Sequence, residues 1–388
     1  MTRIAKSTTE HQNVLLVAIQ APYHHKNVDW PSYVEEFKNL VTSCGMEYQH
    51  VEEIKLREID PGYFITKGKL EEISKICEEL KIETVIFSEI LSVKQERNLE
   101  DFLKADVIDR TRLILDIFAL SAITAEGKAQ VQIAYFEFLR TRVSGKGIEM
   151  SQQAGIVGIR GGFGETAKEK ELRHIHNEIE KLKATLDKVH ATRETQRKHR
   201  LKSQEVLFCL IGYTNAGKSS ILNALTKSNV LAEDKLFATL DTTTRKLYIN
   251  NQKVGVLSDT VGFIQQLPTR LIEAFKSTLS ELQYANLLLQ VIDLTDVNWQ
   301  AHIDVVHQIL AELKVDKPLV YVFNKSDKIE NLTEMQSALD RYQPHVVMST
   351  KSKEGVEPLA NYLLTWRKEH FPSTNPEENF EENSDEQA

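Results

Sequence analysis

The segment Gly212-Tyr-Thr-Asn-Ala-Gly-Lys-Ser219 constrains the fold of this chain more than any other, because of what flanks it. The apolar run 206–211 before it predicts a buried strand, and the run 221–225 after it has helix-forming composition. A strand, a glycine-rich loop and a helix in this order close backbone N–H groups around phosphate oxygens, and the helix N-terminus adds its positive dipole end. The alternative is a glycine-rich turn in which Lys-Ser occurs by chance. Such a turn would not need a strand before it and a helix after it. The sequence therefore predicts a phosphate-binding loop.

Two side chains of this loop have specific predicted roles. Lys218 is expected to reach the β- and γ-phosphates of a nucleotide, and Ser219 is expected to ligate Mg²⁺. The other residues of the loop are expected to surround the phosphates: Gly212, Tyr213, Thr214, Asn215, Ala216 and Gly217. The loop alone does not choose between ATP and GTP.

A second motif, Asn324-Lys325-Ser326-Asp327, selects the base. It follows the apolar run 319–323, which places it at the C-terminal end of a predicted parallel strand, where α/β sheets bind ligands. The Asp327 carboxylate accepts hydrogen bonds, which matches the N1–H and 2-amino donors of guanine, whereas adenine has an acceptor at N1 and no 2-amino group. The predicted ligands are therefore GTP and GDP. Ser349, Thr350 and Lys351 follow a predicted strand at 345–348 and are expected to support the base from its other side.

A third motif, Asp259-Thr260-Val261-Gly262, follows a predicted strand that begins at Val254. Asp259 is expected to hold Mg²⁺ through a water molecule, and the Gly262 N–H is expected to contact the γ-phosphate. Together the motifs outline a GTP-binding domain over 204–371, which is the size of one domain.

Composition limits the class of protein. At 388 residues the chain should hold two or three domains, and 41% hydrophobic with 27% charged residues is ordinary for a soluble globular protein. No apolar run approaches the ~20 residues of a membrane span, and the first residues lack the apolar core of a secretory signal. We therefore expect a cytoplasmic protein. We also expect a monomer, although the sequence does not determine the oligomeric state. Cys44, Cys77 and Cys209 are scattered and are expected to be free core thiols, and the acidic segment 372–388 is expected to be a disordered tail.

The segment 1–108 alternates strand-like and helix-like patterns. Strands are predicted at 14–19 and 84–87, and amphipathic helices at 33–44, 69–80 and 92–103. This alternation predicts a small α/β subdomain with a parallel sheet. The subdomain shows no catalytic constellation. Adjacent histidines on a strand face opposite sides, so we do not assign His24 and His25 to a metal site.

The segment 109–203 changes to long helical patterns. Apolar residues recur at helical spacing from Leu113 to Phe138, and again over 167–201, which predicts two arms of an antiparallel hairpin. Seven of the sixteen glycines lie between Ser144 and Glu165 at its tip, where they allow close approach to a partner. The end of the second arm, 193–202, is basic with Glu194 as its one acid, which fits either a solvated helix face or, as we favour, an RNA-facing surface.

These motifs, together with Phe237-Ala-Thr-Leu-Asp-Thr-Thr-Thr-Arg245 and Phe263-Ile after Gly262, resemble the HflX family of translational GTPases over nearly the whole chain. The resemblance implies that Thr239 is the switch threonine that ligates Mg²⁺ in the GTP state, with the threonines 242–244 as alternatives. Its neighbours are expected to lie at the nucleotide: Phe237, Ala238, Leu240 and Asp241. The expected fold is α/β, with a P-loop GTPase domain of mostly parallel strands after a small α/β domain and an antiparallel helical hairpin.

The resemblance also implies a partner, the large ribosomal subunit and its RNA, into which the glycine-rich tip would reach. The tip keeps Arg160 and Glu165 of the family pattern but has Gly162-Phe163 where the family has Pro. Phe163 is expected either to stack on a base or to fold onto the hairpin. The expected RNA contacts are Arg160, Phe163, Arg193, Arg197 and Lys198. The implied function is the GTP-dependent splitting of stalled or stressed ribosomes, and the alternative is large-subunit assembly.

Phe263 occupies the position where Ras-like enzymes carry a glutamine that orients the attacking water. A phenyl ring makes no such hydrogen bond, so hydrolysis is expected to need outside help. Asn215 resembles the asparagine with which related GTPases coordinate K⁺, which makes K⁺ a second candidate cofactor beside Mg²⁺. The expected catalytic residues are Lys218, Thr239, Gly262 and Asn215. Two alternative functions remain. The first is a kinase or ATPase that acts on a small metabolite, which Asp327 disfavours because its carboxylate matches guanine. The second is an RNA-binding scaffold that uses GTP only structurally, and such a protein would show no turnover stimulated by ribosomes.

Overall fold

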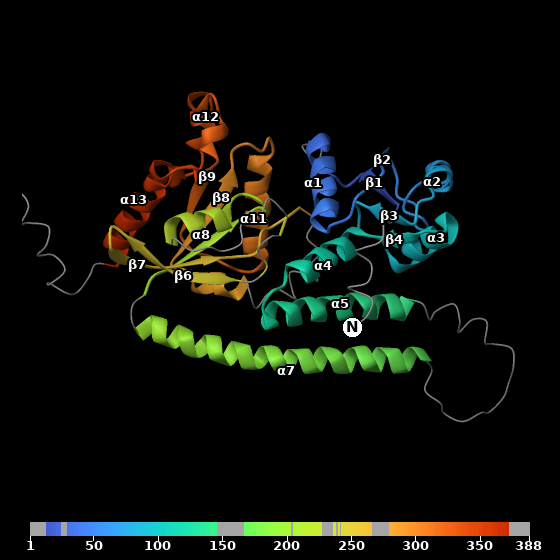
Figure 1. Ribbon diagram of the computed structural model, residues 1–388, viewed down its shortest axis with the longest axis horizontal. Coiled ribbons are helices and arrows are strands. Elements are labelled where there is room, and N and C mark those ends of the chain that lie inside the picture. Colours follow the sequence, from blue (N-terminus) through green and yellow to red (C-terminus); the bar gives the residue numbers. More distant parts are fainter. Residues whose placement is uncertain are drawn as a thin grey trace, which may run out of the picture. The chain divides into compact units, whose positions relative to one another are not determined.

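The computed structural model describes residues 13–24, 29–145, 167–202, 205–226, 236–237, 240, 242–265 and 279–371 (Figure 1). These residues form two compact units. The first unit holds the described residues up to Gln196, together with Leu236, Phe237, Leu240 and Gln265. The second unit holds the rest of the described chain. The expected α/β fold class is confirmed in both units.

The first unit contains a four-stranded parallel sheet in the order β2-β1-β3-β4. The strands are β1 (Val14–Gln20), β2 (His50–Lys55), β3 (Thr84–Phe87) and β4 (Asp106–Ile108). β1 and β3 lie where the sequence predicts them. The sequence analysis did not identify β2, which contains the consecutive acids Glu52 and Glu53, or β4, which has three residues. The strand order reverses between β1 and β3, so the carboxyl ends of these two strands border the crevice where such sheets place functional side chains.

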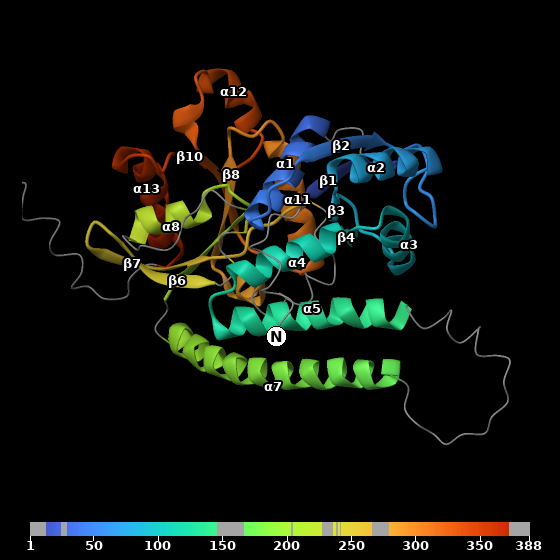
Figure 2. The ribbon, with the colours of Figure 1, turned by 45° about the vertical axis from the view of Figure 1, so that its right-hand side comes forward.

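Three helices pack beside this sheet (Figure 2), and side-chain caps mark the start of two of them. They are α1 (Trp30–Ser43), α2 (Lys67–Leu80) and α3 (Val93–Leu103). The Asp29 side chain accepts a hydrogen bond from the backbone N–H of Ser32, which caps α1. Ser92 and Gln95 form a reciprocal capping box at the start of α3.

The helical segment differs from the prediction in its first arm. Instead of one long helix, α4 (Arg110–Ser121) ends before residues 122–124, and α5 (Ala125–Gly145) begins after them. Leu120, which the periodicity placed on the apolar face of that arm, is 58% exposed. The helix α7 (Ala167–Lys202) lies along α5 in both views (Figures 1 and 2). The Lys168 ammonium donates to the carbonyl of Ser144 at 3.0 Å, so the end of α5 meets the start of α7 and the pair is antiparallel.

Side chains from α5 and α7 share one small apolar core. Its buried members are Ala129, Ile133, Val143, Ile175, Ile179 and Leu186.

Within the described chain, no helix is long and apolar enough to cross a membrane. Cys44, Cys77 and Cys209 are free and buried, as predicted.

The second unit contains a six-stranded sheet in the order β10-β9-β8-β5-β7-β6, parallel except for the edge strand β6. The strands are β5 (Leu207–Gly212), β6 (Thr243–Ile249), β7 (Gln252–Asp259), β8 (Leu287–Asp293), β9 (Leu319–Asn324) and β10 (His345–Val347). The helices are α8 (Lys218–Thr226), α11 (Trp299–Glu312), α12 (Leu332–Leu339) and α13 (Lys353–His370), with short 3-10 turns at Ser280–Tyr284 and Ser326–Lys328. Every residue of β5 is buried, as expected for a central parallel strand covered on both faces. The carboxyl ends of β5, β7, β8 and β9 therefore share one edge of this sheet.

Candidate nucleotide site

The loop between β5 and α8 requires glycine at two positions. Gly212 has φ +145°, and a Cβ there would lie 2.3 Å from the carbonyl oxygen of Val291 in β8. Gly217 has φ +94°, and a Cβ there would lie 2.3 Å from the side-chain nitrogen of Asn324. A side chain at position 212 would collide with the backbone of β8, and one at position 217 would displace the Asn324 amide. The glycines thus let this loop approach β8 and the end of β9 closely.

The Lys218 side chain is buried and curls around the loop. Its ammonium donates to the carbonyl of Tyr213 at 2.7 Å and to that of Gly212 at 3.2 Å. Burial lowers the pKa of this ammonium to about 8, and the Asp259 charge acts in the opposite direction. The loop therefore holds a cation at its centre, where the backbone N–H groups of the helix start also point.

The pairing of β5 with β7 brings a hydroxyl and a carboxylate together. Leu210 of β5 pairs with Asp259 at the end of β7, and the Ser219 hydroxyl donates to the Asp259 carboxylate at 2.6 Å. The next residue, Thr260, donates its hydroxyl to the Leu210 carbonyl at 2.7 Å. Oxygen atoms of this kind suit Mg²⁺, which takes few protein ligands beside water and phosphate oxygens. Among the described residues, no group of three or more His, Cys, Asp or Glu side chains is placed to hold a metal ion.

Gly262 and Phe263 pack directly on the phosphate loop. A Cβ on Gly262 would lie 2.9 Å from the Cα of Thr214 and 3.0 Å from the Lys218 ammonium. The Phe263 N–H donates to the Gly212 carbonyl at 3.0 Å, and its carbonyl accepts from the Thr214 N–H at 2.8 Å. The Phe263 ring is fully buried. The residue after Gly262 therefore offers the site no polar side chain, only backbone.

The segment Asn324–Asp327 and Ser349 come together beyond the ends of β9 and β10. The Asn324 amide donates to the Ala216 carbonyl at 2.9 Å, which connects this segment to the phosphate loop. The Asp327 carboxylate accepts from the Ser349 hydroxyl at 2.6 Å, and this hydrogen bond is the main reason that the pKa of Asp327 lies below its usual value. The Lys351 ammonium lies 3.9 Å from the same carboxylate. The acceptor pair expected to recognise guanine is thus ionised and oriented by a neighbour.

Asp293 and His302 support the site, and neither residue had a signal in the sequence. The Lys325 ammonium donates at 2.6 Å to the carboxylate of Asp293 at the end of β8. The backbone of Lys325 has φ +62°, and this ion pair stabilises Lys325 in that left-handed conformation. The Tyr213 ring stacks on His302 of α11 with ring centroids 3.6 Å apart and planes within 7°. Both contacts join segments about 30 to 90 residues apart, so only the tertiary fold reveals them.

Two of the predicted residues, Phe237 and Leu240, belong to the first unit, and several others lie outside the described chain. Phe237 is buried in the first unit, where its ring meets that of Phe118 on α4 edge-on at 4.7 Å, and Leu240 is buried in the same unit. Ala238, Thr239, Asp241 and the tip with Arg160 and Phe163 lie outside the described residues. Arg193, Arg197 and Lys198 lie on the backbone of α7, and their side chains are outside the described structure. Thr350 lies between Ser349 and Lys351.

Three family models match the chain in succession. They are described as "GTP-binding GTPase N-terminal" over residues 31–119, "GTP-binding GTPase Middle Region" over 121–200 and "50S ribosome-binding GTPase" over 207–325. Among solved structures, the crystal structure of SsGBP in complex with GDP is similar in fold, with a TM-score of 0.51 at 22% identity. The match covers 92% of this chain and 99% of SsGBP.

The fold and the arrangement of these motifs on one sheet edge define a P-loop GTPase, an enzyme that hydrolyses GTP to GDP and phosphate. The GTPase HflX of Magnetococcus marinus is 40% identical over 331 residues, which cover 85% of this chain and 76% of the relative. The GTPase HflX of Escherichia coli is 40% identical over 332 residues, covering 85% and 78%. The chain belongs to the HflX family of GTPases.

Proposed function

We propose that the edge of the second sheet binds GTP with the phosphates in the 212–219 loop and the guanine between Asp327 and Ser349. The observation that carries this proposal is the hydrogen bond from Asn324 to Ala216, which joins the base-end motif to the phosphate loop. Lys218 then reaches the β- and γ-phosphates, and the Gly262 N–H donates to the γ-phosphate. These residues bind and orient the nucleotide.

Mg²⁺ would be held by Ser219 directly, by Asp259 through a water molecule and, in the GTP state, by Thr239. When bound, the ion neutralises charge that develops on the phosphate oxygens. The contact between Ser219 and Asp259 supports this assignment, because it brings the two expected oxygen donors within 2.6 Å of each other.

Because the Phe263 ring is buried, no side chain at that position orients the attacking water. Help in hydrolysis then comes from outside the described site. We propose the large ribosomal subunit as its source, with K⁺ at Asn215 as a second contribution. The family model described as a 50S ribosome-binding GTPase supports this partner.

The proposed activity is the GTP-dependent splitting of stalled or stressed ribosomes in the cytoplasm. The antiparallel α5 and α7 would support the glycine-rich tip, and the tip with the basic end of α7 would contact ribosomal RNA. A second candidate function, large-subunit assembly, uses the same contacts.

Replacing residues 151–164 by a short glycine linker tests this proposal. We expect GTP affinity to be retained, because long loops contribute little to the stability of a distant sheet. With wild-type protein and GTP, stalled ribosomes should sediment as subunits, whereas with the variant they should sediment intact. Intact ribosomes with wild-type protein, together with binding to free large subunits, would favour assembly. Full splitting by the variant would exclude a role for the tip.

A further inference from the structure

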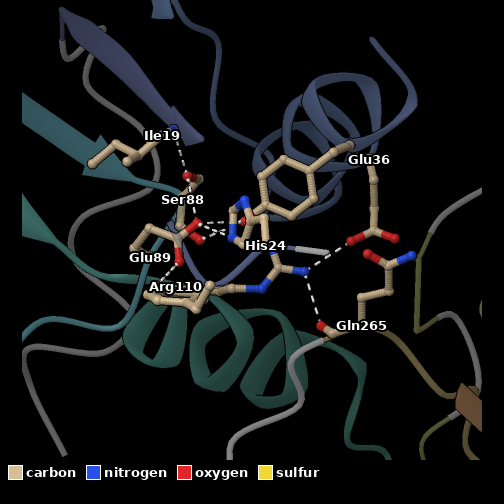
Figure 3. Close-up of polar contacts among 9 residues, drawn as sticks. Ile19, His24, Glu36, Ser88, Glu89, Arg110 and Gln265 are labelled. Carbon is tan, nitrogen blue, oxygen red and sulfur yellow. Dashed lines mark hydrogen bonds and ion pairs between the residues drawn. The ribbon is translucent and has the colours of Figure 1, made fainter. Parts of the chain in front are cut away.

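A buried polar side chain needs hydrogen-bond partners, as the surroundings of Glu89 in the first unit show (Figure 3). The Glu89 side chain is 1% exposed, and its carboxylate accepts from the Tyr33 hydroxyl at 2.7 Å and lies 3.2 Å from the His24 imidazole. The buried Ser88 hydroxyl beside it accepts from the Ile19 N–H at 2.9 Å. A buried polar group that has no such partner is unfavourable, so it indicates a role other than packing.

The phosphate loop of the second unit contains such a group, the hydroxyl of Thr214. Thr214 is 6% exposed, and its hydroxyl oxygen is buried with no hydrogen-bond partner among the described residues. Valine has nearly the same shape and would fill this position without the cost of removing a hydroxyl from water. Packing therefore does not account for a threonine at this position.

The side chain of Thr214 lies beside Gly262, the residue whose N–H is the proposed donor to the γ-phosphate. The Thr214 N–H donates to the Phe263 carbonyl at 2.8 Å, which fixes the backbone of Thr214 against this segment. A Cβ on Gly262 would lie 2.9 Å from both the Cα and the methyl carbon of Thr214, and 3.0 Å from the Lys218 ammonium. The hydroxyl is on the same carbon atom as that methyl group, so it lies close to Gly262 and to Lys218.

A threonine hydroxyl suits a phosphate group chemically. It can donate one hydrogen bond, and phosphate oxygens accept hydrogen bonds. A hydrogen bond to a charged acceptor is also stronger than one between neutral groups. GDP has no γ-phosphate, so a donor beside Gly262 meets a further set of acceptor oxygens only when GTP is bound. The GTP state can therefore supply the partner that the Thr214 hydroxyl lacks.

We propose that the Thr214 hydroxyl binds the γ-phosphate of GTP by donating a hydrogen bond to it. This bond adds to those from Lys218 and the Gly262 N–H, and it raises affinity for GTP without raising affinity for GDP. Since Phe263 offers the site only backbone, Thr214 supplies a side-chain hydroxyl that the segment after Gly262 lacks. The inference rests on the GTP site proposed above.

The test compares Thr214→Val with the wild type in affinity for GDP and for a non-hydrolysable GTP analogue. We expect the analogue to bind about tenfold more weakly and GDP to bind within about twofold of wild type, because one hydrogen bond to a charged group is lost from the γ-phosphate alone. Without nucleotide, Thr214→Val should melt at the same temperature as the wild type or higher, because valine leaves no unpaired hydroxyl. A merely structural hydroxyl would instead stabilise the protein without nucleotide.

Thr214→Ser keeps the hydroxyl and should keep most of the affinity for the GTP analogue. Thr226→Val on α8 is the matched control, because the Thr226 hydroxyl donates to the Leu222 carbonyl at 2.7 Å. This replacement should lower thermal stability and leave the ratio of the two affinities unchanged.

Three results would overturn the role of Thr214: equal losses for GDP and the analogue, an unchanged ratio in Thr214→Val, or a lower melting temperature of that variant without nucleotide. Lys218→Ala separates this proposal from the GTP site on which it rests. Retained GDP affinity in Lys218→Ala contradicts the site itself. Lost GDP affinity there, together with an unchanged ratio in Thr214→Val, contradicts the role of Thr214 alone.

Discussion

At the scale of single residues, Asp327 shows how a short motif acquires its chemistry from a neighbour. The Ser349 hydroxyl donates to its carboxylate at 2.6 Å, and Lys351 lies 3.9 Å away. Both interactions favour the ionised carboxylate, which is the form that accepts two hydrogen bonds.

Replacing Asp327 by Asn should shift base preference from guanine to xanthine, because an amide accepts at one end and donates at the other. Loss of charge-assisted bonds of about 1.5–3 kcal/mol each predicts at least a roughly tenfold loss of GTP affinity. Competition between GTP and XTP measures the shift. Ser349→Ala is the control, since it keeps the carboxylate and should keep guanine preference. Unchanged GTP affinity in the Asn variant would remove Asp327 from the base site.

At the scale of elements, three helices meet around buried charges. Arg142 of α5 contacts Glu96 of α3 and Asp109, which caps α4. Burial outweighs the Arg142 charge and raises the pKa of Glu96 to about 7, and it raises the pKa of Asp116 to about 6. This junction therefore binds protons more strongly when folded than when unfolded.

The free energy of unfolding should fall as pH rises from about 4.5 to about 7. Between the ordinary pKa of Glu96, 4.5, and its folded value of about 7, the folded state holds a proton that the unfolded state has released. The loss from Glu96 should be at most about 3 kcal/mol and should stop above pH 7. Glu96→Gln should flatten this slope in denaturant unfolding at several pH values. Glu137→Gln, which breaks a more exposed pair with Arg140, should leave the slope intact. A slope in Glu96→Gln as steep as in the wild type between pH 6 and pH 7, above the folded pKa of about 6 of Asp116, would refute the assignment.

At the scale of the whole molecule, the position after Gly262 is occupied by Phe263, whose buried ring can make no hydrogen bond to an attacking water. We propose that a cation or the large ribosomal subunit completes the site, which would make GTP turnover depend on their presence. Asn215, at φ +60°, is the residue of the phosphate loop that we assign to K⁺.

Turnover should therefore be faster in K⁺ than in Na⁺, and large ribosomal subunits should stimulate it in either salt. Asn215→Gly should erase the difference between the cations and leave GDP affinity nearly unchanged, because glycine tolerates the same backbone angle. Stimulation by ribosomal subunits should decrease as salt increases, owing to counterion release from RNA. Steady-state phosphate release measures all three effects. Rapid turnover by the isolated protein, insensitive to cation and ribosome, would contradict this mechanism.

The sequence by itself determined the phosphate loop, the base motif and the parallel sheets that carry them. In these segments a few consecutive residues set local geometry, as when Gly212 and Gly217 permit positive φ values beside a strand end. The sequence also predicted the strands at 14–19 and 84–87, because a continuous apolar run is the pattern of a covered parallel strand.

Only the tertiary structure decided the rest. The break between α4 and α5 was not predicted, although Thr124 supplies a local signal because its hydroxyl accepts from the Gly127 N–H at 3.0 Å and caps α5. The stack of Tyr213 on His302 joins the end of β5 to α11, 89 residues further along the chain. The hydrogen bond from Arg110 to the Gln265 carbonyl joins residues 155 positions apart. Such contacts form because burial removes a polar side chain from water and requires a partner wherever the packing supplies one, irrespective of distance along the chain.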